Sequence, residues 1–174
     1  MILLAGVGYP DLSDLSFGPK LAERLRDMPW PPEVQIENLS YGPIAVLHWF
    51  EDHPGKFGRA IFIGAVERGR EPGTLATYGW ISGSPAPEDV QASVSEAVTG
   101  IISLENLLII AHHFGVLPPE TSVVELEPVE PGWGMELSPL GEERMEEAAE
   151  WIRRRVYSGG GPTGNGRHEE VRNR

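Results

Sequence analysis

The sequence contains no cysteine and few basic residues. Its 174 residues include 26 Asp and Glu against 14 Lys and Arg, which gives a formal charge of −12 at pH 7. Without cysteine the chain cannot form disulfides, use a thiol nucleophile or bind metal through thiolates. The negative charge argues against binding to nucleic acid, whose phosphates require a basic surface, and against binding to anionic membrane surfaces.

Long apolar runs are also absent. No stretch approaches the roughly 18 to 20 apolar residues of a membrane-spanning helix. The N-terminus lacks the basic region of a signal peptide, because an apolar run begins at Met1. We therefore expect a cytoplasmic protein. With 40% hydrophobic residues, residues 1–157 can form a single α/β domain, whereas the glycine-rich and apolar-poor residues 158–174 are predicted to be a disordered tail.

Apolar runs alternate with segments of helical periodicity along this domain. Strands are predicted at residues 1–5, 33–39, 60–66, 75–81 and 121–126, of which 60–66 and 75–81 are expected to be central strands buried on both faces. Helices are predicted after residues 17, 43, 104 and 141. Their predicted inward faces include Leu21, Ala22 and Leu25 in the first, Ile44, Leu47 and His48 in the second, and Met145, Ala149, Ile152 and Val156 in the last. The polar residues 67–71 are expected to be a solvated loop, and Glu125, Glu127 and Glu130 an acidic exit from the last strand. Alternation of strands and helices predicts an α/β three-layer sandwich with a mostly parallel central sheet.

A glycine-rich loop, Gly6-Val7-Gly8, follows the first strand. Loops at the carboxyl ends of parallel strands commonly form binding sites. A dinucleotide site would need a third glycine opening the helix and an acidic residue about 20 positions later, and Tyr9-Pro10 follows here instead. Asp11 and Asp14 are expected to cap this turn and the helix after it.

Several short motifs occur once each, in a fixed order, over residues 1–156. The residues of the first motif are Gly6, Val7, Gly8, Pro10, Asp14, Phe17, Gly18 and Pro19. The later motifs are Ile36 to Gly42, Glu71-Pro72-Gly73-Thr74, Leu126-Glu127-Pro128 and Leu137-Ser138-Pro139. This pattern resembles the hydrogenase maturation endopeptidases, which trim the C-terminus of the large subunit of nickel-iron hydrogenases. The resemblance implies their α/β fold and a protein client.

Three positions depart from that family. Its members hold a nickel ion with an acidic residue after the motif Asp, an Asp after the central strand and a His at the start of a later helix. Those positions correspond to Leu15, Gly64 and Gly100, none of which has a metal-ligating side chain. We therefore expect no bound metal and no catalytic residues. Adjacent His112 and His113 cannot replace the lost ligands together, because neighbouring helical side chains point about 100° apart.

Two functions follow from the resemblance. The first is a catalytically degenerate relative that binds a hydrogenase large subunit or a related client in the cleft at the sheet's carboxyl edge. The predicted cleft residues are Tyr9, Pro10, Leu12, Asp14, Leu15, Tyr41, Gly64 and Gly100. The alternative is an active endopeptidase that removes the C-terminal extension of the large-subunit precursor, with Asp14, Asp11 and Glu67 as the nearest carboxylates. An unrelated binding function on this fold also remains open, and the sequence does not specify an oligomeric state.

Overall fold

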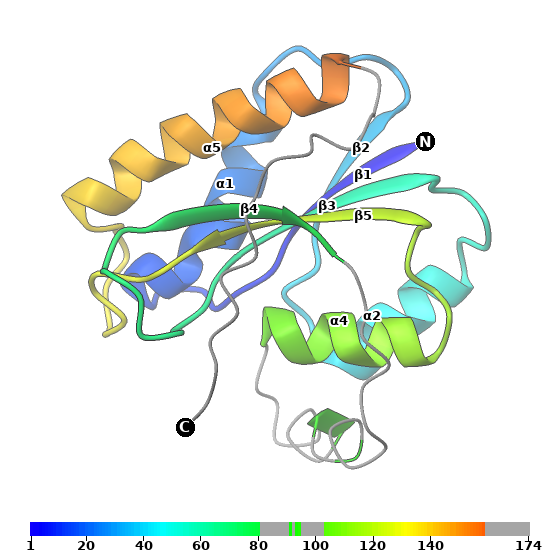
Figure 1. The fold of residues 1–174 in the computed structure, drawn as a ribbon, viewed down its shortest axis with the longest axis horizontal. Coiled ribbons are helices and arrows are strands. Elements are labelled where there is room, and N and C mark those ends of the chain that lie inside the picture. Colours follow the sequence, from blue (N-terminus) through cyan, green and yellow to red (C-terminus); the bar gives the residue numbers. More distant parts are fainter. Residues whose placement is uncertain (81–90, 92, 95–102, 159–174) are drawn as a thin grey trace, which may run out of the picture.

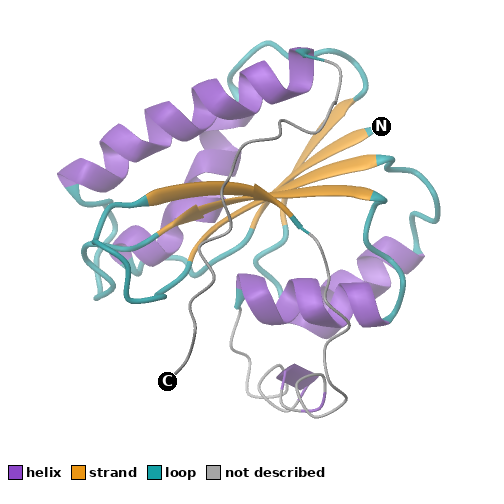
Figure 2. Ribbon diagram, viewed as in Figure 1, coloured by secondary structure: helices purple, strands orange, loops and turns teal. Residues whose placement is uncertain are grey.

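A five-stranded sheet lies between two layers of helices (Figures 1 and 2). The computed structural model describes residues 1–80, 91, 93, 94 and 103–158. The strands are β1 (Ile2–Gly6), β2 (Val34–Asn38), β3 (Arg59–Ala65), β4 (Leu75–Gly79) and β5 (Glu120–Leu126). The helices are α1 (Phe17–Arg26), α2 (Pro43–Glu51), α4 (Leu104–His113) and α5 (Pro139–Tyr157), and a 3-10 turn, η1 (Ser13–Ser16), precedes α1. The predicted three-layer α/β fold is confirmed. Gly100 and the predicted tail after Ser158 lie outside the described residues.

The strand order is β2-β1-β3-β5-β4, and only the pairing of β4 with β5 is antiparallel among the described strands. We expected residues 75–81 to form a buried strand. The structure instead places β4 at the edge of the sheet, where Thr77 and Gly79 are exposed. Since β5 lies between β3 and β4, the connection from β3 to β4 must cross the carboxyl end of β5.

Each face of the sheet has its own core. Helices α1 and α5 cover one face, where the predicted inward residues Leu21, Ala22 and Leu25 are fully buried. Helices α2 and α4 cover the other face, and Phe62 of β3 lies between the sheet and these helices. None of the described helices is long and apolar enough to cross a membrane.

Helix α2 packs through a different face from the predicted one. Ile44, Leu47 and His48 share helical spacing, but Ile44 and His48 are exposed, and Val46, Leu47 and Phe50 are buried. The buried pair Val46 and Phe50 is also spaced by four residues, so periodicity alone could not choose between the two overlapping faces.

The motif glycines Gly6 and Gly18 allow α1 to lie directly against the sheet. A Cβ atom on Gly18 would collide with the carbonyl oxygens of Val7 and Ile63, and one on Gly6 would collide with the carbonyl oxygen of Gly18. These contacts involve backbone atoms, which cannot move aside as a flexible side chain can. The glycines of this motif therefore have a packing role that requires no bound ligand.

Candidate functional site

The candidate site lies at the carboxyl edge of the parallel strands. The glycine loop follows β1, Tyr41 follows β2, and Gly64 lies next to the last residue of β3. In open α/β sheets this edge is where ligands usually bind. The fold therefore gathers the segments that carry the predicted site residues.

The glycine loop is folded back on itself. The Tyr9 amide donates to the Leu15 carbonyl at 3.2 Å, and the Leu12 amide donates to the Ser16 hydroxyl at 3.0 Å. Leu12 and Leu15 are half-buried, and Tyr41 is exposed. These bonds fix the loop in one conformation.

A polar cleft of about 370 Å³ lies beside the glycine loop and α1. Pro10 lines it together with charged and amide side chains that include Asp11, Lys20, Glu23 and Asn38. Among the predicted cleft residues that the structure describes, only Pro10 lines this cleft. The others lie on the same edge of the sheet but outside that cavity.

Asp14 is fully buried and links two segments that are far apart in the sequence. Its Oδ2 accepts hydrogen bonds from the amides of Val129 and Glu130 at 2.8 and 3.0 Å and from the Ser138 hydroxyl at 2.8 Å. Its Oδ1 accepts from the Ser138 amide at 2.8 Å. Ser138 in turn caps α5. Asp14 thus stabilises the start of α5, and our prediction that it caps its own helix is wrong.

Gly64 lies in a narrow space. A Cβ atom at this position would be 3.0 Å from Leu104 Cδ2 and 3.0 Å from the Val7 carbonyl oxygen. In the sheet, Gly64 pairs with Glu125 of β5. The residue beside Gly64 in the neighbouring strand is therefore acidic.

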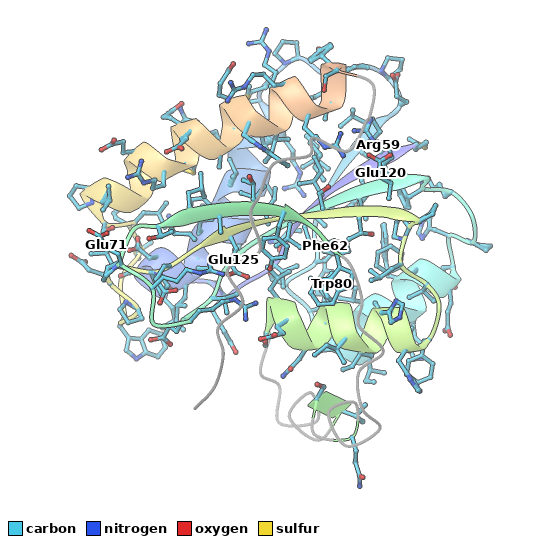
Figure 3. The ribbon with its side chains drawn as sticks, viewed as in Figure 1. Arg59, Phe62, Glu71, Trp80, Glu120 and Glu125 are labelled. Atoms are coloured by element: carbon cyan, nitrogen blue, oxygen red, sulfur yellow. The ribbon has the colours of Figure 1, made fainter. Side chains whose placement is uncertain are left out.

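Buried Glu125 is the centre of a partly exposed ion-pair cluster, which comprises Arg68, Arg70, Tyr78, Glu105 and Glu125. Its carboxylate is 0% exposed and accepts two hydrogen bonds from Arg68, from Nε at 2.7 Å and from Nη2 at 3.0 Å. Arg70 Nη1 donates to Oε1 at 2.7 Å, and the Tyr78 hydroxyl donates to Oε2 at 2.9 Å. Arg68 Nη1 also contacts Glu105 at 3.3 Å. In Figure 3, Glu125 lies at the opposite end of β5 from the ion-paired Arg59 and Glu120.

Glu127 holds the backbone of the same loop. Its carboxylate accepts hydrogen bonds from the Arg68 amide at 3.0 and 3.1 Å and from the Gly69 amide at 3.0 Å. Gly69 has a positive φ of 73°, which glycine adopts without strain. Glu125 and Glu127, at the carboxyl end of β5, therefore bind the segment that connects β3 to β4.

The cluster changes the protonation equilibria of its members. Burial alone would raise the pKa of Glu125, but the hydrogen bonds of Arg68, Tyr78 and Arg70 and the charge of Arg68 outweigh it and hold that pKa below 4.5. Burial, followed by the charge and the hydrogen bond of Glu125, raises the pKa of Tyr78 to about 12. The hydrogen bond to Glu125 also raises the pKa of Arg68. At neutral pH, Glu125 is therefore ionised and Tyr78 is a neutral donor.

The residues present do not fit a nickel ion. Leu15 and Gly64 have no donor atoms in their side chains, and the carboxylate of Glu125, the strand partner of Gly64, already binds two guanidinium groups. In the part of the chain that the structure describes, no three His, Asp or Glu side chains are grouped to hold a metal. A dication beside Arg68 and Arg70 would also be repelled.

Sequence reasoning missed this cluster. Residues 67–71 form the predicted exposed loop, but sequence reasoning gave no indication that the side chains of Arg68 and Arg70, 27% and 34% exposed, bind Glu125. The prediction that Glu125 and Glu127 belong to an acidic exit from the last strand is wrong, because both residues are buried. The available signal was the spacing of Glu125 and Glu127, since residues two apart on a strand point to one face.

Comparisons with known proteins support the fold. No family model matches the sequence, and no curated protein matches it. Among solved structures, the chain is similar to a hydrogenase 2 maturation peptidase from a Thaumarchaeota archaeon, with 25% identity, a TM-score of 0.62, and coverage of 90% of this chain and 97% of that one.

The chain is also similar to two solved structures from Escherichia coli. A protein described as an endopeptidase has 24% identity and a TM-score of 0.66, and the hydrogenase maturating endopeptidase HybD has 23% identity and a TM-score of 0.64. Each match covers 91% of this chain and 93% of the other chain. The resemblance to the hydrogenase maturation proteases is confirmed, and the chain has their fold.

Proposed function

We propose that this protein is a catalytically degenerate relative of the hydrogenase maturation proteases that binds a protein client. The client is the large subunit of a nickel-iron hydrogenase or a related polypeptide. Binding uses the carboxyl edge of the sheet, with Tyr9, Pro10, Leu12, Leu15 and Tyr41 as contact residues. No peptide bond is hydrolysed, because no Lewis acid is held to polarise its carbonyl.

The observation that supports this proposal is the ion-pair cluster of Glu125, the strand partner of Gly64. A metal-dependent site needs N and O donors with an open coordination position. Here the carboxylate of Glu125 is committed to Arg68, Arg70 and Tyr78. The arrangement suits a structural ion pair and disfavours a divalent cation.

Nickel titration tests the proposal. At micromolar protein and nickel concentrations and neutral pH, isothermal titration calorimetry should give no binding isotherm, because Leu15, Gly64 and Gly100 contribute no donor. A variant with His112→Ala and His113→Ala serves as a control, since an exposed histidine can bind nickel weakly at the surface.

Tight binding of one nickel ion per chain that persists in the double histidine variant would contradict the degenerate assignment. It would favour the active endopeptidase instead. Weak binding that disappears with His112 and His113 would be surface binding and would leave the proposal in place.

A further inference from the structure

Two large apolar side chains protrude from the connection between β5 and α5. Trp133 is 88% exposed and Met135 is 72% exposed. Single exposed apolar residues are common, but these two lie two positions apart on one segment, and Val129 of the same segment is also exposed. Trp is the residue type most enriched among the residues that dominate binding energy at protein interfaces.

The backbone that carries these side chains is fixed to the glycine loop. The Ser13 amide donates to the Gly134 carbonyl at 2.8 Å, and the Gly134 amide donates to the Asp11 carbonyl at 3.1 Å. Leu12 and Gly134 form a parallel β-bridge. A Cβ atom on Gly134 would collide with the Ser13 hydroxyl. Since the segment is already ordered, a partner that binds Trp133 loses less conformational entropy on association.

The two chain segments that meet at Gly134 are acidic. Neither residues 9–16 nor residues 127–138 contain a Lys or Arg. Asp11, Glu130 and Glu136 are exposed in these two segments, whereas Asp14 and Glu127 are buried and occupied by hydrogen bonds. The surface thus combines an indole ring and a thioether with three solvent-accessible carboxylates.

We propose that Trp133 and Met135 form a docking surface for a basic polypeptide segment of the client. An arginine or lysine of that segment stacks on the Trp133 ring, where a cation is attracted to the aromatic face. A neighbouring apolar side chain packs on Met135, whose flexible thioether adapts to different shapes. Glu130 and Glu136 attract the remaining basic groups. This inference rests on the proposed function, because the segment belongs to the client.

A second copy of this chain fits the surface less well. In a symmetric dimer the same patch would face itself, so that the carboxylates of Asp11, Glu130 and Glu136 would lie within one interface together with those of the second copy. Like charges at close range disfavour such a contact. Charge complementarity therefore selects a basic partner.

Peptide binding tests the docking surface directly. The probe is a short fluorescein-labelled peptide in which arginine alternates with leucine, and its comparison peptide carries glutamate in place of arginine. Fluorescence anisotropy should show that the wild-type protein binds the basic peptide and not the acidic one. Trp133→Ala should weaken binding about tenfold or more, and Met135→Ala by a smaller factor.

Phe114→Ala is the matched control, because Phe114 is an aromatic residue with 53% exposure at the end of α4. It should bind the basic peptide as the wild type does. Circular dichroism should show that Trp133→Ala remains folded, since the ring makes little contact with the core.

Equal binding by wild type and Trp133→Ala, or no binding of the basic peptide at all, would overturn the proposal. Sedimentation that shows a dimer in the wild type and a monomer in Trp133→Ala would assign the surface to a second copy and would also overturn it. Nickel binding and client cleavage are read separately. A failure of peptide binding would therefore contradict the docking surface but not the degenerate assignment. Nickel binding or client cleavage would contradict the degenerate assignment but not the docking surface.

Discussion

Replacement of Glu125 by alanine is expected to lower the free energy of unfolding by about 2 to 3 kcal/mol, less than for a fully buried ion pair, because Arg68 and Arg70 are partly exposed and remain partly hydrated. Arg68 and Arg70 would lose the carboxylate that neutralises them, and the Tyr78 hydroxyl would lose its acceptor. Urea denaturation followed by circular dichroism measures the change.

Glu120→Ala is the matched control for this substitution. Glu120 begins the same strand and forms ion pairs with Arg59 and Arg155, but its side chain is 39% exposed. Solvent screens such pairs, so the loss should be about 1 kcal/mol or less. Equal losses for the two variants would mean that the cluster around Glu125 contributes no more than a surface ion pair.

The contribution of Glu125 also depends on pH. Its pKa in the folded protein lies below that of the unfolded chain, so its stabilisation is fully present above pH 4.5 and is lost as the pH falls through the folded value. The difference in unfolding free energy between wild type and Glu125→Gln should therefore be constant near neutrality and shrink under acidic conditions. A difference that grows on acidification would contradict the lowered pKa.

Asp14→Ala is expected to destabilise the protein by about 3 kcal/mol or more. The variant would leave the buried Ser138 amide and hydroxyl and the partly buried amides of Val129 and Glu130 without their acceptor, and an unsatisfied buried donor costs about 1 to 3 kcal/mol. Urea denaturation gives the total loss. Hydrogen exchange of these three amides gives its location, and they should exchange faster than amides of the central strands.

Asp11→Asn is the control, because Asp11 is exposed and has a φ of 57°, a conformation that Asn also adopts readily. It should change the unfolding free energy by about 0.5 kcal/mol or less. If Asp14→Ala were as mild as Asp11→Asn, the Asp14 carboxylate would not hold the start of α5.

The main elements of the fold could be predicted from periodicity. The apolar runs of β1 and β3 and the inward residues of α1 and α5 agree with the structure, because burial on both sheet faces demands continuous apolar strands and one apolar helix face. The edge position of β4 could not be predicted. Its composition resembles that of a buried strand, and strand order depends on contacts between distant segments.

The chemistry of the site was less predictable. The absence of ligands at Leu15 and Gly64 follows directly from residue types, but the ion-pair cluster that lies beside Gly64 does not. Arg68 and Glu125 are separated by more than fifty residues in the sequence. Their contact arises only because the connection from β3 to β4 crosses the end of β5. The sequence also contained no sign that Asp14 binds the segment before α5.

Client cleavage is the measurement that tests the degenerate assignment most directly. A nickel-loaded precursor of a nickel-iron hydrogenase large subunit, from the organism that encodes this chain, is incubated with the purified protein. Biolayer interferometry follows binding and intact mass spectrometry follows the C-terminal extension. We predict that a complex forms and that the mass of the precursor does not change. Loss of the C-terminal extension in the presence of this protein, and not in its absence, would contradict the assignment.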